Sequence, residues 1–198
     1  MAINKEPILK KCKALGISPM VMGVGKETKR DPKANVRKKE SEYSKQLKEK
    51  QKLKFIYGVL EKQFRHIYEK AEKMEGQAGT NLLTLLELRL DNVAYRMGLS
   101  MTRREARQLV SHGHFNVNGA RVDIPSYRVK VGDVIALREN SKKSVKFKEI
   151  VEATNGRLIP TWLEVDKENL TAKVVRLPAK EDLDYEVEEH MIVELYSK

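Results

Sequence analysis

A group of arginines in the middle of the chain has the residue types and spacing that suit phosphate. Arg103 and Arg107 lie one helical turn apart, and Glu105 is the one carboxylate within that turn that could neutralise them. A planar guanidinium can donate two parallel hydrogen bonds, which fits phosphate oxygens. The alternative is a solvated charged face with local salt bridges. The shortage of acidic partners favours contact with a nucleic acid instead.

The predicted nucleic-acid contacts extend from this turn along the neighbouring segments. Arg89, Asn92 and Arg96 fall at i, i+3 and i+7, so we expect them on one exposed helix face. Polar and aromatic side chains nearby could read the shape of a folded RNA or an unpaired base. The set predicted from the residues is Arg89, Asn92, Arg96, Arg103, Arg104, Arg107, Gln108, Asn116, Asn118, Arg121, Tyr127, Arg128 and Lys130.

Two histidines, His112 and His114, flank Gly113 and invite a metal or an acid–base interpretation. A metal site needs three or four converging ligands. No cysteine or third histidine is near in the sequence, and Asp123 is the one close carboxylate. We therefore predict no metal site and expect both histidines to donate to phosphate from a turn. A plain surface position is the alternative.

Catalysis has little support in the sequence. The tripeptide Arg89-Leu90-Asp91 resembles the one around the catalytic aspartate of some pseudouridine synthases, but that chemistry needs an exposed loop aspartate. Here Leu90 is expected in the core of a helix, and Asp91 is expected to pair locally or cap. No Gly-rich phosphate loop, nucleophile–base pair or persuasive carboxylate pair is present in the sequence. We predict a non-enzymatic protein with no cofactor and no small-molecule substrate.

Composition restricts the partner to a polyanion. The 198 residues carry a formal net charge of +11, which implies nucleic acid or an acidic membrane surface. Residues 1–54 hold 16 Lys and Arg against 6 Asp and Glu, whereas residues 144–198 hold 8 against 12. No apolar run approaches the roughly 18–20 residues of a membrane span, and the start lacks a signal-peptide core. With its single cysteine, Cys12, the chain fits a reducing compartment, so we expect a cytoplasmic protein without membrane contact.

Helical periodicity predicts the scaffold that positions the arginines. Apolar residues recur at three- and four-residue steps over 42–74, behind a lysine-rich lead-in, and again over 81–97. Gly98 is a natural stop for the second helix. Thr102 and Glu105 have the capping-box spacing that begins a third, short helix, and Gly113 suits its left-handed exit.

Alternating apolar residues predict a small antiparallel sheet after the third helix. Residues 115–117 and 122–124 flank Asn118-Gly119, the strongest short hairpin signal, and 134–137 form a further strand. Beyond them, 162–165 and 172–177 are expected to extend the sheet and 150–153 to form a short helix. The apolar residues 191–196 are expected to dock onto the first helical region. Residues 1–44 have few apolar residues at a useful period, so they are predicted to order only on a partner.

Together these blocks resemble the small-subunit ribosomal protein S-four family. The resemblance rests on EYSKQLKEKQKLKFIYGVLEKQFRHIY at 42–68, NLLTLLELRLDNVAYRMG at 81–98 and TRREARQLVSHGHFNVNG at 102–119. It continues through IPSYRVKVGDVI at 124–135, PTWLEVD at 160–166 and EEHMIVELYSK at 188–198. The central block defines a module shared with other RNA-binding proteins, and the flanking blocks single out the ribosomal family.

The resemblance implies a fold, a function and partners. The fold is α+β: an extended N-terminal arm (1–44), a helical domain (45–80 and 181–198), and an inserted RNA-binding module of two helices on a small, mainly antiparallel sheet (81–180). Such proteins bind 16S-type rRNA at a multi-helix junction and nucleate assembly of the small-subunit body. They lie beside neighbouring ribosomal proteins where the mRNA enters, contribute to translational accuracy, and in some cases repress their own mRNA.

The resemblance also implies which residues contact RNA, and the N-terminal arm differs from the pattern of some relatives. The residues it carries over are Lys48, Lys50, Arg96, Arg103, Arg104, Arg107, His112 and Asn118, and Lys45 and Lys52 of the lysine-rich lead-in complete the predicted set. Some relatives carry a four-cysteine zinc knuckle in the arm, but this chain keeps only Cys12, so we predict a zinc-free variant. The alternative function is an RNA-binding regulator, a ribosome-rescue factor or an RNA-modifying protein that carries the same module.

Overall fold

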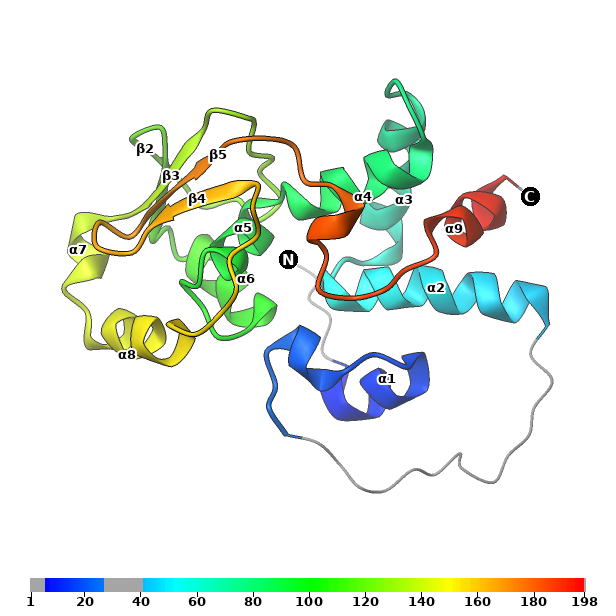
Figure 1. Cartoon of the computed structure of the whole chain (residues 1–198), viewed down its shortest axis with the longest axis horizontal. Helices are drawn as coiled ribbons and strands as arrows, with labels where there is room; N and C mark the ends of the chain where they lie inside the picture. Colours follow the sequence, from blue (N-terminus) through cyan, green and yellow to red (C-terminus); the bar gives the residue numbers. More distant parts are fainter. Residues whose placement is uncertain (1–5, 27–40, 198) are drawn as a thin grey trace. The chain divides into compact units, whose positions relative to one another are not determined.

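The chain folds as an α+β protein whose five-stranded antiparallel sheet lies in one of two compact units (Figure 1). The computed structural model describes residues 6–26 and 41–197. Unit 1 comprises the residues up to 82 together with 184–198, and unit 2 comprises Leu83–Leu183. The predicted fold class is confirmed.

Unit 1 is helical and brings the end of the chain onto its first long helices. It contains α1 (Ile8–Leu15), the 3₁₀ helix η1 (Pro19–Met22), α2 (Glu42–Ile56), α3 (Glu61–Glu72) and α9 (Glu189–Tyr196). Helix α9 packs against α2, and the Tyr196 ring stacks on Tyr68 with 4.5 Å between the ring centroids. The predicted docking of residues 191–196 is confirmed.

The N-terminal segment corrects one expectation. Residues 8–22 form two short helices, where the sequence predicted no regular structure. Gly16 and Gly23 end these helices in the left-handed conformation, with φ of 70° and 76°, and the Cys12 side chain is fully buried. Elements of eight and four residues are too short to show a helical period. Residues 27–40, including the basic run Arg37-Lys38-Lys39, lie outside the described residues.

The apolar pattern over 42–74 belongs to two helices rather than one. Gly58 adopts φ 62° between α2 and α3, and the Val59 amide donates to the Lys54 carbonyl at 3.0 Å across the turn. Val59, which follows the break, is also buried. The apolar spacing therefore continues across the turn and does not reveal it.

The predicted helix over 81–97 is also interrupted, between α4 (Ala78–Glu87) and α5 (Leu90–Arg96). Arg89 is extended, with φ −71° and ψ 136°, and pairs as an antiparallel bridge with Arg128. The Leu90 amide donates to the Tyr127 carbonyl at 2.9 Å. Hydrogen bonds to a segment almost forty residues further along the chain therefore replace those of a continuous helix.

Unit 2 places α6 (Arg103–Ser111) before the sheet, whose strand order is β2-β1-β3-β5-β4. The strands are β1 (Phe115–Val117), β2 (Ala120–Val122), β3 (Val134–Leu137), β4 (Leu163–Asp166) and β5 (Thr171–Val174), and neighbouring strands pair antiparallel. Asn118 and Gly119 take φ of 49° and 83°, as a type I′ hairpin requires. The predicted hairpin and the predicted extension of the sheet are confirmed.

Two short helices and a 3₁₀ turn complete unit 2. Helices α7 (Glu139–Lys142) and α8 (Val145–Thr154) connect β3 to β4, and η2 (Lys180–Asp182) follows β5. One cluster of buried apolar side chains, drawn from residues 88–174, forms the core of this unit, and the Trp162 and Phe115 side chains in it are fully buried. Among the described residues, no helix combines the length and hydrophobicity needed to cross a membrane.

Candidate nucleic-acid interface

Helix α6 carries the predicted arginine turn and is fixed at its start by a cap. The Thr102 hydroxyl accepts a hydrogen bond from the Glu105 amide at 3.2 Å, and the Glu105 carboxylate accepts one from the Met101 amide at 2.8 Å. The predicted cap is therefore present. Ala106, Leu109 and Val110 are buried on one side of the helix. Arg104 and Arg107 are half-buried and Gln108 is exposed, which leaves these three able to meet a ligand.

The exposed face predicted for Arg89, Asn92 and Arg96 is wrong. All three side chains are at most 5% exposed, and Arg103 of α6 is 6% exposed. The cause is the break between α4 and α5, which turns these positions toward the protein instead of the solvent.

A buried carboxylate, Glu87, organises this group. Its two oxygens accept hydrogen bonds from the Arg96 guanidinium at 3.1 and 2.9 Å. One of them also accepts from the side-chain amide of Asn92, Nδ2, at 2.8 Å. The Asn92 side-chain oxygen, Oδ1, in turn accepts one from Arg103 Nε at 2.9 Å. These side chains therefore hold the end of α4 to α5 and α6 in the interior of unit 2, where an unpaired charge would be costly.

The Arg89–Asp91 pair is likewise internal. Arg89 donates to both carboxylate oxygens of Asp91, at 3.1 and 2.8 Å, and the Asn92 amide donates to Asp91 at 2.9 Å. Asp91 is 5% exposed. It pairs locally, which is one of the two predicted roles, and it is not the exposed loop aspartate that uridine isomerisation requires.

Arg157 is a structural residue that the sequence argument missed. Its guanidinium donates to the carbonyl oxygens of Tyr95, Ser100 and Met101 at 3.0, 2.8 and 3.0 Å. The Tyr95 ring lies 4.3 Å from the Arg157 guanidinium carbon and 4.4 Å from that of Arg103, within cation–π range. Arg157 follows an Asn-Gly turn and lies more than fifty residues along the chain from these carbonyl groups. No local sequence pattern predicts the contact.

The turn at Gly113 brings several predicted residues together. Gly113 has φ 71°, the predicted left-handed exit from α6, and the Arg121 guanidinium lies directly against it, where a Cβ atom would overlap. His112 is exposed and His114 is half-buried, with 6.1 Å between their ring centroids. Arg138, which the sequence argument missed, donates to the Gly113 carbonyl at 3.1 Å.

The predicted contact residue at the hairpin, Asn118, makes hydrogen bonds within the protein. Asn118 donates to the Asp133 carboxylate at 2.8 Å and accepts from the Val134 amide at 2.9 Å. The second Asp133 oxygen accepts from the Lys130 amide at 2.8 Å. The Asn118 side chain thus closes the turn before β3, while the exposed Lys130 side chain can face a ligand.

The remaining predicted residues of unit 2 differ in exposure. Tyr127 is 36% exposed, and Asn116 on β1 and Arg128 are half-buried. Burial, and then the positive charge of Arg89, lower the pKa of Arg128. Of the three, Tyr127 is the most accessible.

The predicted lysines lie on α2 in unit 1, separate from the α6 group. Lys45, Lys50 and Lys52 pair with Glu42, Glu61 and Glu49 at 2.9, 3.0 and 3.3 Å, and Lys48 is half-buried. Burial alone would raise the pKa of Glu61, but hydrogen bonds and charges from Lys54 and Lys50 outweigh it and lower the pKa to about 2. Lys50 therefore also holds α2 to α3.

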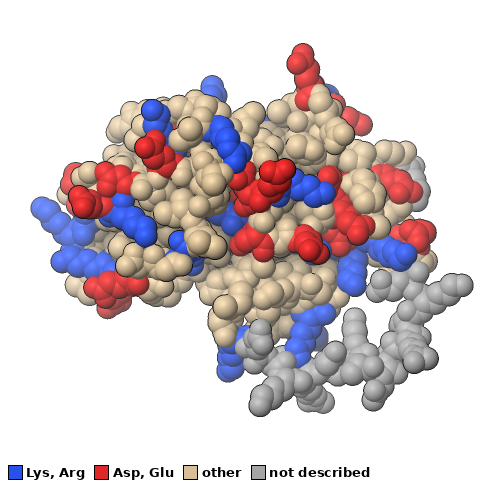
Figure 2. All heavy atoms as spheres, in the orientation of Figure 1, with Lys and Arg blue, Asp and Glu red and all other residues tan. Residues whose placement is uncertain are grey.

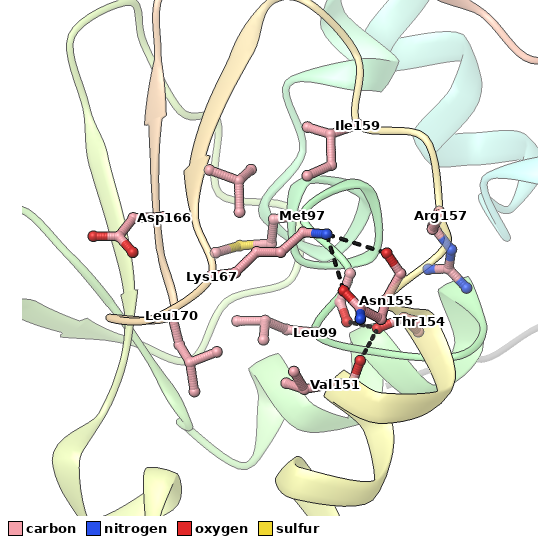
Figure 3. Close-up of a pocket in the computed structure, with 12 residues that line it drawn as sticks. Met97, Leu99, Val151, Thr154, Asn155, Arg157, Ile159, Asp166, Lys167 and Leu170 are labelled. Atoms are coloured by element: carbon pink, nitrogen blue, oxygen red, sulfur yellow. Dashed lines mark hydrogen bonds between the residues drawn. The ribbon is translucent and has the colours of Figure 1, made fainter.

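A small hollow in unit 2 lies between the end of α5 and the loop before β4 (Figure 3). Its walls are mainly apolar, with Met97, Leu99 and Ile159 among them, and Lys167 reaches across to donate to the Asn155 side-chain and backbone oxygens at 3.2 and 3.1 Å. Across residues 6–26 and 41–197, no group of three or more His, Cys, Asp or Glu side chains is placed to hold a metal ion.

Basic side chains gather on part of the surface of unit 2. Figure 2 shows Lys and Arg side chains over the end that carries α7 and α8, with acidic side chains between them. Lys146 of α8 lies 3.3 Å from Glu105 of α6, which joins this surface to the arginine turn. The sequence signal for this surface is the run of four lysines within residues 142–148.

Two helices on a small antiparallel sheet, with arginines on the second helix and a tight hairpin behind it, define the S4-domain class of proteins. A family model described as "S4 domain" matches residues 88–135, and one described as "Ribosomal protein S4/S9 N-terminal domain" matches residues 4–87. A relative named "Small ribosomal subunit protein uS4" is 55% identical over the whole chain, so the chain belongs to that family, and the resemblance seen in the sequence is confirmed.

Individual relatives agree over most or all of their length. The protein named "Small ribosomal subunit protein uS4" of Lachnospira eligens is 55% identical over 198 residues, which cover 100% of both chains. The protein of that name from Fusobacterium nucleatum is 52% identical over 198 residues, which cover 100% of both chains. The one from Clostridioides difficile is 64% identical over 162 residues, which cover 82% of this chain and 78% of the relative.

Proposed function

We propose that the protein is a structural, non-enzymatic constituent of the small ribosomal subunit that binds rRNA. The observation that carries the proposal is the α6 surface, where Arg104, Arg107 and Gln108 stand on a helix fixed by a cap and by a buried hydrogen bond from Arg103 to Asn92. Relatives that match the whole chain bear the name of a small-subunit ribosomal protein. Family and surface thus support the same function.

The mechanism follows from rigidity. Because Glu87, Asn92 and Arg103 fix α6 to its neighbours, the arginines next to them lose little conformational freedom when they meet phosphate. The buried arginines therefore act as positioning residues, and those at the surface act as contacts. Lys48 and the other α2 lysines, His112, Arg121 and Lys130 complete the proposed contact set.

Finer parts of the function rest on the family alone. We propose binding at a multi-helix junction of 16S-type rRNA, nucleation of the subunit body, contact with neighbouring ribosomal proteins, and a contribution to accuracy where the mRNA enters. Contact with mRNA itself, the cytoplasmic location, and the division into an arm (1–44), a helical domain (45–80 and 181–198) and an inserted module (81–180) belong to the same proposal.

A salt titration tests the rRNA interface. If about six to eight phosphates are neutralised, the log–log slope of affinity against salt is roughly −4 to −7. Alanine at both Arg104 and Arg107 should reduce the slope by about 1 for each lost contact, measured by filter binding to a five-prime-domain rRNA transcript. Arg65→Ala is the matched control, because Arg65 is an exposed arginine of α3 in unit 1. A wild-type slope near −1 would contradict the proposal.

The alternatives predict a different distribution among particles. A free regulator, a rescue factor or an RNA-modifying protein would not remain stoichiometric with the small subunit in a high-salt sucrose gradient. We expect stoichiometric comigration with the small subunit. Exclusive migration with large subunits or free RNA would favour the alternatives.

A further inference from the structure

The Gly113 turn collects basic groups from four elements of unit 2. His112 follows α6, Arg121 lies on β2, Arg138 follows β3, and Lys146 lies on α8. The Arg121 guanidinium fits against the turn because residue 113 has no side chain, and Arg138 holds the turn through the Gly113 carbonyl at 3.1 Å. The arrangement brings several positive charges to one short stretch of backbone.

The His114 imidazole lies at the centre of these charges. One ring nitrogen, Nδ1, is 2.9 Å from the Ser141 hydroxyl, and the ring packs edge-on against Phe147 with 5.3 Å between the centroids. Burial lowers the pKa of His114, and the charges of His112, Lys146, Arg138 and Arg121 lower it further. Positive charge in the free protein therefore favours the neutral imidazole.

The nearby carboxylates relieve this repulsion only in part. Glu105 lies 3.3 Å from Lys146, and Glu139 lies 2.7 Å from Lys142, so each is engaged by a lysine. A ligand with its own negative charge would change the balance at His114 most.

We propose that the Gly113 turn binds a backbone phosphate of RNA and that His114 takes up a proton when it does so. This inference rests on the proposed rRNA-binding function and adds its dependence on pH. A phosphodiester brings one negative charge among Arg121, Arg138 and Lys146, which offsets their repulsion of an imidazolium. The protonated ring can in turn strengthen the site through its charge. Proton binding and RNA binding then favour each other reciprocally.

The sign of the pH dependence follows from this coupling. The pKa of His114 is higher in the complex than in the free protein, so lowering the pH strengthens RNA binding. The gain is complete below the pKa of the free protein and is lost as the pH rises through the pKa of the complex. Each unit by which RNA raises the pKa corresponds to about a tenfold gain in affinity.

The test measures affinity for the five-prime-domain rRNA transcript between about pH 5.5 and pH 8, at constant salt, with the full chain. Calorimetry in buffers of different ionisation enthalpy counts the protons taken up. We expect wild-type affinity to rise severalfold toward acid with net proton uptake, and His114→Gln to flatten most of that rise. The matched control is His66→Gln, an exposed histidine of α3, which should retain the wild-type profile.

A second variant protects the test against misfolding, because His114 also packs on Phe147. Lys146 is exposed, with 54% of its side chain accessible. Lys146→Gln removes one repelling charge, so it should raise the pKa of free His114 and reduce both RNA affinity and its pH dependence. A wild-type affinity that is independent of pH, or binding without proton uptake, would overturn this inference alone. Failure to bind the transcript at every pH would overturn the proposed function as well.

Discussion

At the residue scale, the decisive group is a buried carboxylate. Glu87 is 1% exposed and accepts hydrogen bonds from both Arg96 and Asn92. Glu87→Gln keeps the shape but leaves the buried Arg96 charge uncompensated, so we expect unfolding free energy to fall by about 3–5 kcal/mol. Denaturant unfolding measures the loss, and Glu164→Gln at an exposed position of β4 is the matched control. Equal stability of the two variants would show that the pair contributes nothing to the fold.

Residue-scale signals were readable from the sequence only where they were local. The Thr102–Glu105 cap and the Asn118-Gly119 hairpin depend on neighbouring residues, so their patterns predicted them correctly. The positions of Arg89 and Arg96 depend on the bridge from Arg89 to Arg128, which no helical period contains. The same arginine-rich pattern is thus compatible with an exposed surface and with a buried network. The assignment of individual side chains to RNA contacts stays a prediction.

At the element scale, the loop from the end of α5 to α6 depends on one distant arginine. Arg157 donates to three carbonyl oxygens of this loop and α5, so Arg157→Met should destabilise unit 2 by about 2–3 kcal/mol. It should also weaken rRNA binding without changing the salt slope, because α6 loses its position but no phosphate contact is removed. Thermal unfolding and filter binding measure both effects. Lys173→Met, at an exposed position of β5, is the control for loss of charge, and a reduced slope in Arg157→Met would instead make Arg157 a phosphate contact.

At the scale of the whole molecule, the chain divides into two compact units, and we expect each to respond separately to damage. The single tryptophan, Trp162, lies in the core of unit 2, whereas Tyr196 joins α9 to α3 in unit 1. Its ring stacks on Tyr68 and its hydroxyl donates to Glu61 at 3.1 Å.

Tyr196→Ala should therefore lower the unfolding free energy of unit 1 by about 3 kcal/mol. Far-ultraviolet circular dichroism should show an earlier transition for the helices of unit 1, while the Trp162 fluorescence transition keeps its midpoint, which is the signature of a chain that is not two-state. Tyr43→Ala, at an exposed tyrosine of α2 that is 60% accessible, should leave both transitions unchanged. If Tyr196→Ala moved the two transitions together, the units would unfold as one cooperative structure, and damage to the helical unit would then reach the α6 surface as well.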